Sequence, residues 1–244
     1  MKIWQKILLG VTVIVTVAGL VTGLGVARGL DTERSCRQLD IIVSDSAERQ
    51  IVTKGELVRL MKTNDCYPVG KRLKHISTDR IEDLVTDHPM VRTAECYPTS
   101  EDHIVVVLHQ RVPLLKVVTE AGTYYIDTDR EPMPVRESVT EEVLRVGGHV
   151  GERMAREELA DFAEWLQDNR YWNRRIRAVR VVDQKHIYLV QQQGEPVILI
   201  GEMQGYERRL RKLRTFMEKG WPGLPDKPQY KELDIRFKDQ VIGR

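Results

Sequence analysis

The hydrophobic pattern of the chain begins with an uninterrupted apolar stretch. From Ile7 to Ala27, 21 consecutive residues carry no charge. At about 1.5 Å of rise per residue, a helix of this length spans roughly 30 Å, the thickness of the hydrocarbon core of a bilayer. The pattern predicts a retained transmembrane helix. A cleaved signal peptide is the alternative, because Gly25 to Ala27 are small residues of the kind found at cleavage sites, but signal peptides have shorter apolar regions.

The charges beside this stretch predict its orientation. Lys2 and Lys6 precede the span, and a head of residues 1–6 is most readily left in the cytoplasm. Residues 28–37 are polar and form a short linker on the other side. The rest of the chain is therefore expected to be an ectodomain.

In the first part of the ectodomain, residues 38–110, strand and helix patterns follow one another in the order β-α-α-β-β. A β-branched run at Leu39–Val43 predicts the first strand. Thr53 opens a Thr-x-x-Glu capping box ahead of a helical pattern, and Ser77 or Thr78 caps a second helix. Two alternating segments predict the remaining strands, Met90–Tyr97 and His103–His109.

The second part, residues 111–244, is dominated by short strand patterns and contains two amphipathic helices. The expected strands are Leu114–Val118, Thr123–Ile126, Pro132–Val135, Ile176–Val182, His186–Val190, Pro196–Ile200 and Leu233–Phe237. The expected helices are Gly151–Asn169 and Gln204–Lys219. The fold class is α+β: a transmembrane helix, a β-α-α-β-β domain, and a mixed antiparallel β domain with flanking helices.

The composition excludes several classes of protein. The chain has 38 basic and 36 acidic residues and a net charge of +2, which gives no field strong enough to make nucleic acid the main partner. Two local clusters of cations stand out, at 208–214 and at Arg174, Arg175, Arg177 and Arg180. The first is interpreted as the solvated face of a helix, because Leu210 and Leu213 interrupt it at helical spacing. The second is interpreted as the charged start of a strand, with a binding patch as the alternative.

The three cysteines leave two interpretations open. Cys36, Cys66 and Cys96 lack the spacing of a zinc site. If the ectodomain is periplasmic, Cys66 and Cys96 could form a disulfide that stabilises the fold by about 3 to 4 kcal/mol. Buried free thiols are the alternative.

Catalytic motifs are missing from the sequence. The six histidines are scattered, no HExxH pair occurs, and no serine lies in a GxSxG motif. We therefore expect a protein that is not an enzyme and that has no cofactor, no metal site and no small-molecule substrate.

The end of the chain has the pattern of a strand edge. Leu233–Phe237 alternates between apolar and polar residues, and Lys238–Arg244 continues it after a polar break. Such a terminal strand either pairs only within its own sheet or leaves an open edge to which another chain adds a strand.

Several segments, taken in order, resemble the FtsQ/DivIB cell-division family. These segments are Ile81–Leu84 with His88–Ala94, the junction Gln110–Val117, Tyr124–Asp127 with Met133–Pro134, and the tail Leu233–Phe237. The first pair is similar to the helix-to-strand passage of a POTRA domain, and the junction is similar to the start of the family's β domain. The resemblance covers nearly the whole chain.

The resemblance implies a scaffold of the bacterial division complex. Its location would be the inner membrane, crossed once, with the N-terminus in the cytoplasm, the ectodomain in the periplasm and enrichment at the septum. The POTRA domain and the span would help recruitment, and the last strand would receive a strand from an FtsB-like protein that travels with an FtsL-like one.

Carried onto this chain, the partner-binding stretch is Phe237–Gly243. Phe237 would be the hydrophobic anchor, Lys238 and Asp239 polar partners, and Gln240, Val241 and Ile242 the pairing backbone, with Gly243 closing the stretch. Gln240 and Val241 depart from the family pattern, in which some members have small residues there. The alternative functions are a POTRA-type envelope protein that handles polypeptides in outer-membrane export, and a secreted hydrolase.

Overall fold

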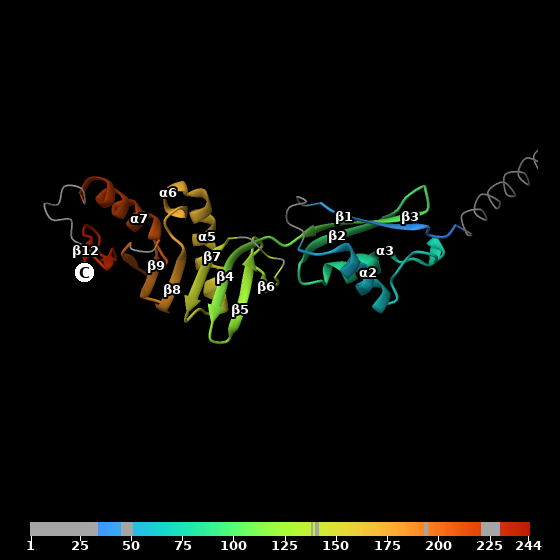
Figure 1. The fold of residues 1–244 in the computed structure, drawn as a ribbon, viewed down its shortest axis with the longest axis horizontal. Helices are drawn as coiled ribbons and strands as arrows, with labels where there is room; N and C mark the ends of the chain where they lie inside the picture. The colour runs from blue at the N-terminus through green and yellow to red at the C-terminus, as the bar shows by residue number, and fades with distance from the viewer. Residues whose placement is uncertain (1–33, 45–50, 138, 140–141, 193–194, 221–229) are drawn as a thin grey trace, which may run out of the picture. The chain divides into compact units, whose positions relative to one another are not determined.

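A computed structural model describes residues 34–44, 51–137, 139, 142–192, 195–220 and 230–244 (Figure 1). Contacts divide the chain into two compact units between Gln110 and Arg111. The predicted membrane span, Ile7–Ala27, and the head before it lie outside the described residues. Within the described residues, no helix combines the length and the apolar character needed to cross a membrane.

The first unit contains three strands and two longer helices in the predicted order. The elements are β1 (Gln38–Val43), α2 (Lys54–Thr63), the short helix η2 (Leu73–His75), α3 (Thr78–Thr86), β2 (Val91–Pro98) and β3 (His103–Gln110). The sheet order is β1-β3-β2, in which β3 runs parallel to β1 and antiparallel to β2. A β-α-α-β-β unit is therefore present where the sequence indicates one.

The two helices of this unit begin at their predicted caps. The Thr53 hydroxyl accepts a hydrogen bond from the backbone N–H of Glu56, and the Ser77 hydroxyl accepts one from Arg80. Figure 1 shows α2 and α3 on the same face of the sheet. Their buried side chains, Leu57, Met61, Ile81 and Val85, form the core of the unit together with Val106 and Leu108.

The second unit is built on one sheet of nine strands. Its elements are β4 (Pro113–Thr119), β5 (Gly122–Asp127), β6 (Pro132–Pro134), β7 (Leu144–Gly148), α4 (Glu152–Arg156), α5 (Glu158–Asp168), α6 (Arg170–Asn173), β8 (Ala178–Asp183), β9 (His186–Val190), β10 (Val197–Gly201), α7 (Tyr206–Thr215), a π-helical turn η3 (Phe216–Gly220), β11 (Glu232–Asp234) and β12 (Ile242–Gly243). The order across the sheet is β12-β11-β10-β9-β8-β7-β4-β5-β6.

The prediction of an antiparallel domain is only partly right. The meander β8-β9-β10 is antiparallel as expected, but β7 runs parallel to both β4 and β8, and β11 runs parallel to β10. No strand is predicted from the sequence at the position of β7, because the pair Gly147-Gly148 is typical of a turn. The sheet is therefore mixed, with a parallel strand near its middle.

The single helix predicted over Gly151–Asn169 is also wrong, because two shorter helices, α4 and α5, replace it, and α6 follows them. At the junction of α4 and α5, Glu157 has φ −102° and ψ −85°, which lies outside the helical region. The Arg130 guanidinium, which comes from a turn far away in the sequence, donates to the carbonyls of Arg156 and Glu157 at 3.3 and 3.2 Å. The Arg130 guanidinium thus supplies hydrogen-bond donors to two carbonyls at the break between the helices. Helical periodicity in the sequence does not reveal this long-range contact.

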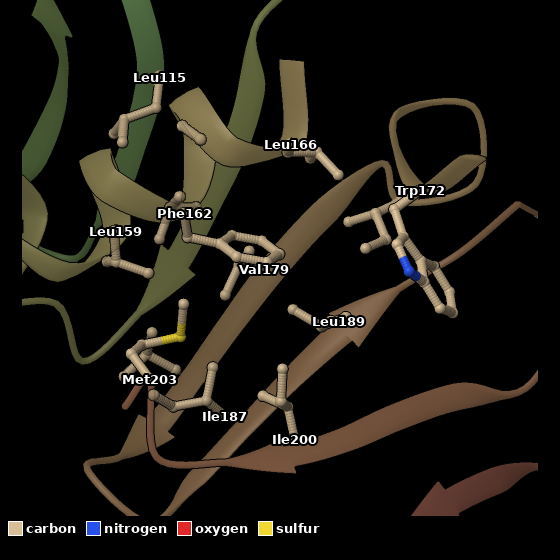
Figure 2. Close-up of a cluster of buried hydrophobic side chains, with 14 of the residues drawn as sticks. Leu115, Leu159, Phe162, Leu166, Trp172, Val179, Ile187, Leu189, Ile200 and Met203 are labelled. Atoms are coloured by element: carbon tan, nitrogen blue, oxygen red, sulfur yellow. The ribbon is translucent and has the colours of Figure 1, made fainter. Parts of the chain in front are cut away.

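Helices α5 and α7 cover one core of this unit. Figure 2 shows Phe162 of α5 facing Val179 of β8 and Leu189 of β9. The Phe162 ring also contacts Tyr206, the first residue of α7, with ring centroids 5.1 Å apart. The apolar face of α7, formed by Leu210 and Leu213, is fully buried in the same cluster.

The predicted last strand, Leu233–Phe237, is shorter than expected. Strand β11 ends at Asp234, and β12 returns antiparallel to it, with Leu233 opposite Gly243 and Asp234 opposite Ile242. The Asp234 carboxylate accepts a hydrogen bond from the backbone N–H of Arg236 at 3.2 Å, which is a local turn contact. The last strand of the described residues is therefore β12.

Candidate partner-binding edge

The nine-stranded sheet ends in two edges, β6 and β12, which differ in their backbone donors. On the β6 side, the N–H of Asp127 donates to the carbonyl of Glu131 at 3.0 Å, which places these two residues at a hydrogen-bonded position of the antiparallel ladder, and the N–H of Glu131 donates to the Asp127 carboxylate at 2.7 Å. Because such pairs alternate along a ladder, Pro132 and Pro134 turn their nitrogens away from β5. Proline has no N–H, so this edge presents no donor at either position.

The β12 edge has the opposite character. Glu232 and Arg244 exchange two backbone hydrogen bonds, Arg244 N–H to Glu232 carbonyl at 3.0 Å and Glu232 N–H to Arg244 carbonyl at 3.1 Å. The same alternation turns the N–H and the carbonyl of Gly243 away from β11. Among the described residues, β12 therefore presents a backbone donor and acceptor that can pair with an added strand.

Gly243 also fits closely against its own unit. A Cβ atom at this position would lie 2.3 Å from two ring carbons of Tyr230, so the ring packs on the glycine backbone. This contact favours glycine at residue 243.

Asp234 fixes the turn that precedes β12. Its carboxylate is fully buried and accepts two hydrogen bonds from the Arg236 guanidinium, at 3.0 and 2.8 Å. The Arg244 guanidinium lies 3.8 Å from the same carboxylate. Burial raises the pKa of Asp234, but the hydrogen bonds from Arg236 outweigh burial and hold the pKa below its ordinary value.

Lys212 of α7 holds the segment between the two strands. Its ammonium donates to the carbonyls of Ile235 at 3.1 Å and Gln240 at 2.8 Å, and it also donates to the carbonyl of Phe237. Burial lowers the pKa of Lys212, and the nearby Asp239 carboxylate opposes that shift. One ammonium group thus donates to three carbonyls of a segment that is not paired with a strand.

The predicted partner-binding residues fall into two groups. Phe237 lies in the connecting segment with 46% of its surface exposed, and Lys238, Asp239 and Gln240 beside it are also exposed. Val241, Ile242 and Gly243 are half-buried, and only the last two belong to β12. The predicted pairing backbone at Gln240 therefore belongs to the connecting segment, and the ladder begins at Ile242.

A basic hollow of about 600 Å³ adjoins this segment. Its lining contains Gly205, Arg208, Arg209, Lys212, Arg236, Lys238 and Asp239. Sequence reasoning missed the roles of Lys212 and Arg209, which were assigned to a solvated face. Both are half-buried, and Arg209 donates to the carbonyls of Glu202 and Gln204 at 2.5 and 2.7 Å.

His88 and the cysteines occupy buried positions. His88 is buried; its Nδ1 accepts from the N–H of Met90 at 3.2 Å, and its Nε2 donates to Glu56 at 3.1 Å. The described residues contain no group of three or more His, Cys, Asp or Glu side chains that could hold a metal ion.

Cys36, Cys66 and Cys96 are buried free thiols in the structure, so of the two interpretations that the sequence leaves open, the structure has the free thiols and no Cys66–Cys96 disulfide. Burial raises the pKa of Cys96 to about 12. A thiol in this environment is poorly reactive at neutral pH, because the thiolate is the nucleophile.

Comparison with known families matches each of the two units to a family model. The family model described as FtsQ/DivIB, C-terminal related, matches residues 112–244, which is more than half of the chain. The chain belongs to the FtsQ/DivIB family. The POTRA-like domain model matches residues 34–109, and no curated protein matches the chain.

These matches confirm the predicted family and the POTRA-like domain. The FtsQ/DivIB-related domain spans all nine strands of the larger sheet, including both of its edges. FtsQ/DivIB and POTRA-like domains are scaffold domains, and they associate this protein with cell division.

Proposed function

We propose that this protein is a non-enzymatic, bitopic scaffold of the bacterial division complex that binds an FtsB-like partner by strand addition to β12. An FtsL-like protein would accompany that partner. The observation that supports the proposal best is the difference between the two sheet edges: β12 directs the N–H and carbonyl of Gly243 outward, whereas β6 directs two proline nitrogens outward. An added strand needs these backbone groups to continue the ladder.

In this proposal, side chains of the segment before β12 make partner binding specific. Phe237, in the segment that leads to β12, offers an exposed aromatic surface, and aromatic residues often contribute most to binding at such interfaces. Lys238 and Asp239 place opposite charges beside it. Lys212 and Asp234 act as positioning residues, because they hold the backbone that carries these side chains.

The proposal includes a location. The apolar stretch Ile7–Ala27 would cross the inner membrane once and leave the two ectodomain units in the periplasm, enriched at the septum. The POTRA-like unit and the span would serve recruitment. The second unit, Arg111–Arg244, which we call the β unit, would serve partner binding.

The test of strand addition compares two variants that differ in one backbone donor. In a Tyr230→Ala background, which removes the ring that a side chain at residue 243 would meet, Gly243→Pro deletes the outward N–H and Gly243→Ala keeps it. The full chain in nanodiscs is titrated with an FtsB-like ectodomain. We expect the proline variant to bind about tenfold more weakly than the alanine variant. Equal affinities, with equal melting temperatures, would exclude β12 as the pairing edge.

A further inference from the structure

A second charged surface lies on the β unit around the short helix α6. It consists of Arg170, Arg174, Arg175, Arg177 and Arg214, and we name it the α6 arginine surface. Sequence reasoning grouped Arg174, Arg175 and Arg177 with Arg180 as the charged start of a strand. In the structure Arg180 instead lies over the Tyr188 ring, while Arg170 and Arg214 join the other three.

Two arginines of this surface are fixed by an aromatic ring. The guanidinium carbons of Arg175 and Arg214 lie 3.9 and 4.5 Å from the centre of the Tyr171 ring. Arg175 also donates to the carbonyl of Tyr171 at 3.2 Å, and Arg214 pairs with Glu218 at 2.8 Å. These contacts hold the two guanidinium groups in place at low entropic cost.

The other three arginines are exposed, and their guanidinium groups are not held by an ion pair to any described carboxylate. Among the described residues, no ion pair includes Arg170, Arg174 or Arg177. The helices just before α6 behave differently, since Arg153 pairs with Glu157 at 3.0 Å and Arg156 pairs with Glu131 at 2.5 Å. Neighbouring cations without counter-charges repel one another, and an anionic ligand would relieve that repulsion.

Two hollows divide this surface and share Arg170 and Arg174. One is about 500 Å³ and also contains Tyr171, Arg175 and Arg214; the other is about 620 Å³ and also contains Arg177. Each hollow has a single carboxylate in its lining, Asp168 in the first and Glu142 in the second. Side-chain amides complete the lining: Asn169 in the first, and Gln167, Asn173 and Gln192 in the second.

We propose that the α6 arginine surface binds an acidic polypeptide segment of a protein partner, at a site separate from β12. The guanidinium groups suit carboxylate side chains, with which arginine forms paired hydrogen bonds. The amides suit the peptide groups between those side chains. A uniform polyanion such as polyphosphate fits less well, because it would meet Asp168 in one hollow and Glu142 in the other.

The test uses a short fluorescein-labelled peptide in which glutamates alternate with serine and glycine, and it measures anisotropy against the full chain in nanodiscs. We expect saturable binding that weakens as salt is added, because the exposed cations are screened. Replacing Arg170, Arg174 and Arg177 by Gln should weaken binding by about tenfold or more. The matched control replaces Lys185, Arg211 and Lys219 by Gln, since these are exposed cations of the same unit outside the surface.

The outcomes separate this proposal from the alternatives. It is overturned by an absence of saturable binding, by an equal loss in the two triple variants, or by polyphosphate competing more strongly than unlabelled peptide. The triple variant at the α6 surface should bind the FtsB-like ectodomain with unchanged affinity. This second readout distinguishes a failure at the α6 surface from a failure at β12.

Discussion

Lys212 shows how a single side chain can determine the geometry of a binding edge. The segment between β11 and β12 has no strand partner along most of its length, yet three of its carbonyls accept hydrogen bonds from one ammonium group. A helical pattern places Lys212 on a polar face, and nothing in that pattern indicates which backbone the side chain reaches. Asp234 is a similar case: its position in a strand pattern does not indicate that the carboxylate is fully buried or which groups it contacts.

Replacing Lys212 by Met should loosen this segment while leaving the helix intact. Methionine keeps the length and the helix propensity of lysine but cannot donate to carbonyls. We expect about 1 to 2 kcal/mol of destabilisation in urea unfolding, and faster hydrogen exchange in peptides that cover residues 235–244. Lys219→Met is the control, because Lys219 is exposed in η3. Equal exchange in the two variants would show that Lys212 does not hold the segment.

Asp234 predicts a specific dependence of stability on pH. Its pKa in the folded state is lower than in the unfolded chain, so the carboxylate stabilises the fold above about pH 4 and this contribution is lost as the pH falls through the folded-state pKa. Asp234→Asn removes the titration. We expect the variant to be about 2 kcal/mol less stable at pH 7 and the difference to shrink towards pH 3, as measured by chemical unfolding. A difference that stays constant over this range would contradict the assignment.

At the scale of elements, local signals predicted the first unit better than the second. Thr53 and Ser77 cap helices through contacts within three residues, and such contacts can be read from sequence. Strand β7 and the break at Glu157 depend on distant residues: β7 on its parallel neighbours β4 and β8, and the break on Arg130. The alternating pattern predicts one terminal strand over Leu233–Phe237, but the return of the chain as β12 depends on Asp234 and Lys212.

Strand β7 can be tested through its two adjacent glycines. Gly148 has φ +99°, and a Cβ there would lie 2.0 Å from the carbonyl oxygen of Val181, so alanine cannot be accommodated without moving β8. At Gly147 the nearest atom, the carbonyl oxygen of Val118, would lie 3.4 Å away. We expect Gly148→Ala to destabilise the protein by about 2 to 4 kcal/mol and Gly147→Ala by less than about 1 kcal/mol in thermal unfolding. Similar losses at the two positions would contradict the close approach of β7 and β8.

At the scale of the whole molecule, two consecutive residues mark where one unit ends and the next begins. The Gln110 side-chain carbonyl accepts hydrogen bonds from the backbone N–H groups of Ile51 and Val52, at 2.7 and 2.8 Å, within the first unit. Arg111 pairs with the buried Asp127 of the second unit at 2.7 Å. Each unit thus has its own polar anchor at the junction and its own core, an arrangement that permits the two to carry separate tasks.

This separation predicts that recruitment and partner binding can be uncoupled in dividing cells. Phe237 belongs to the β unit, so Phe237→Ala should leave a fluorescent fusion of the full chain at midcell while the band of a labelled FtsB-like partner fades. The control is Val182→Ala, because Val182 is 45% exposed in the same unit. If the partner band persists, Phe237 is not the anchor. If the fusion itself leaves midcell, the β unit also takes part in recruitment, and the division of tasks between the two units is wrong.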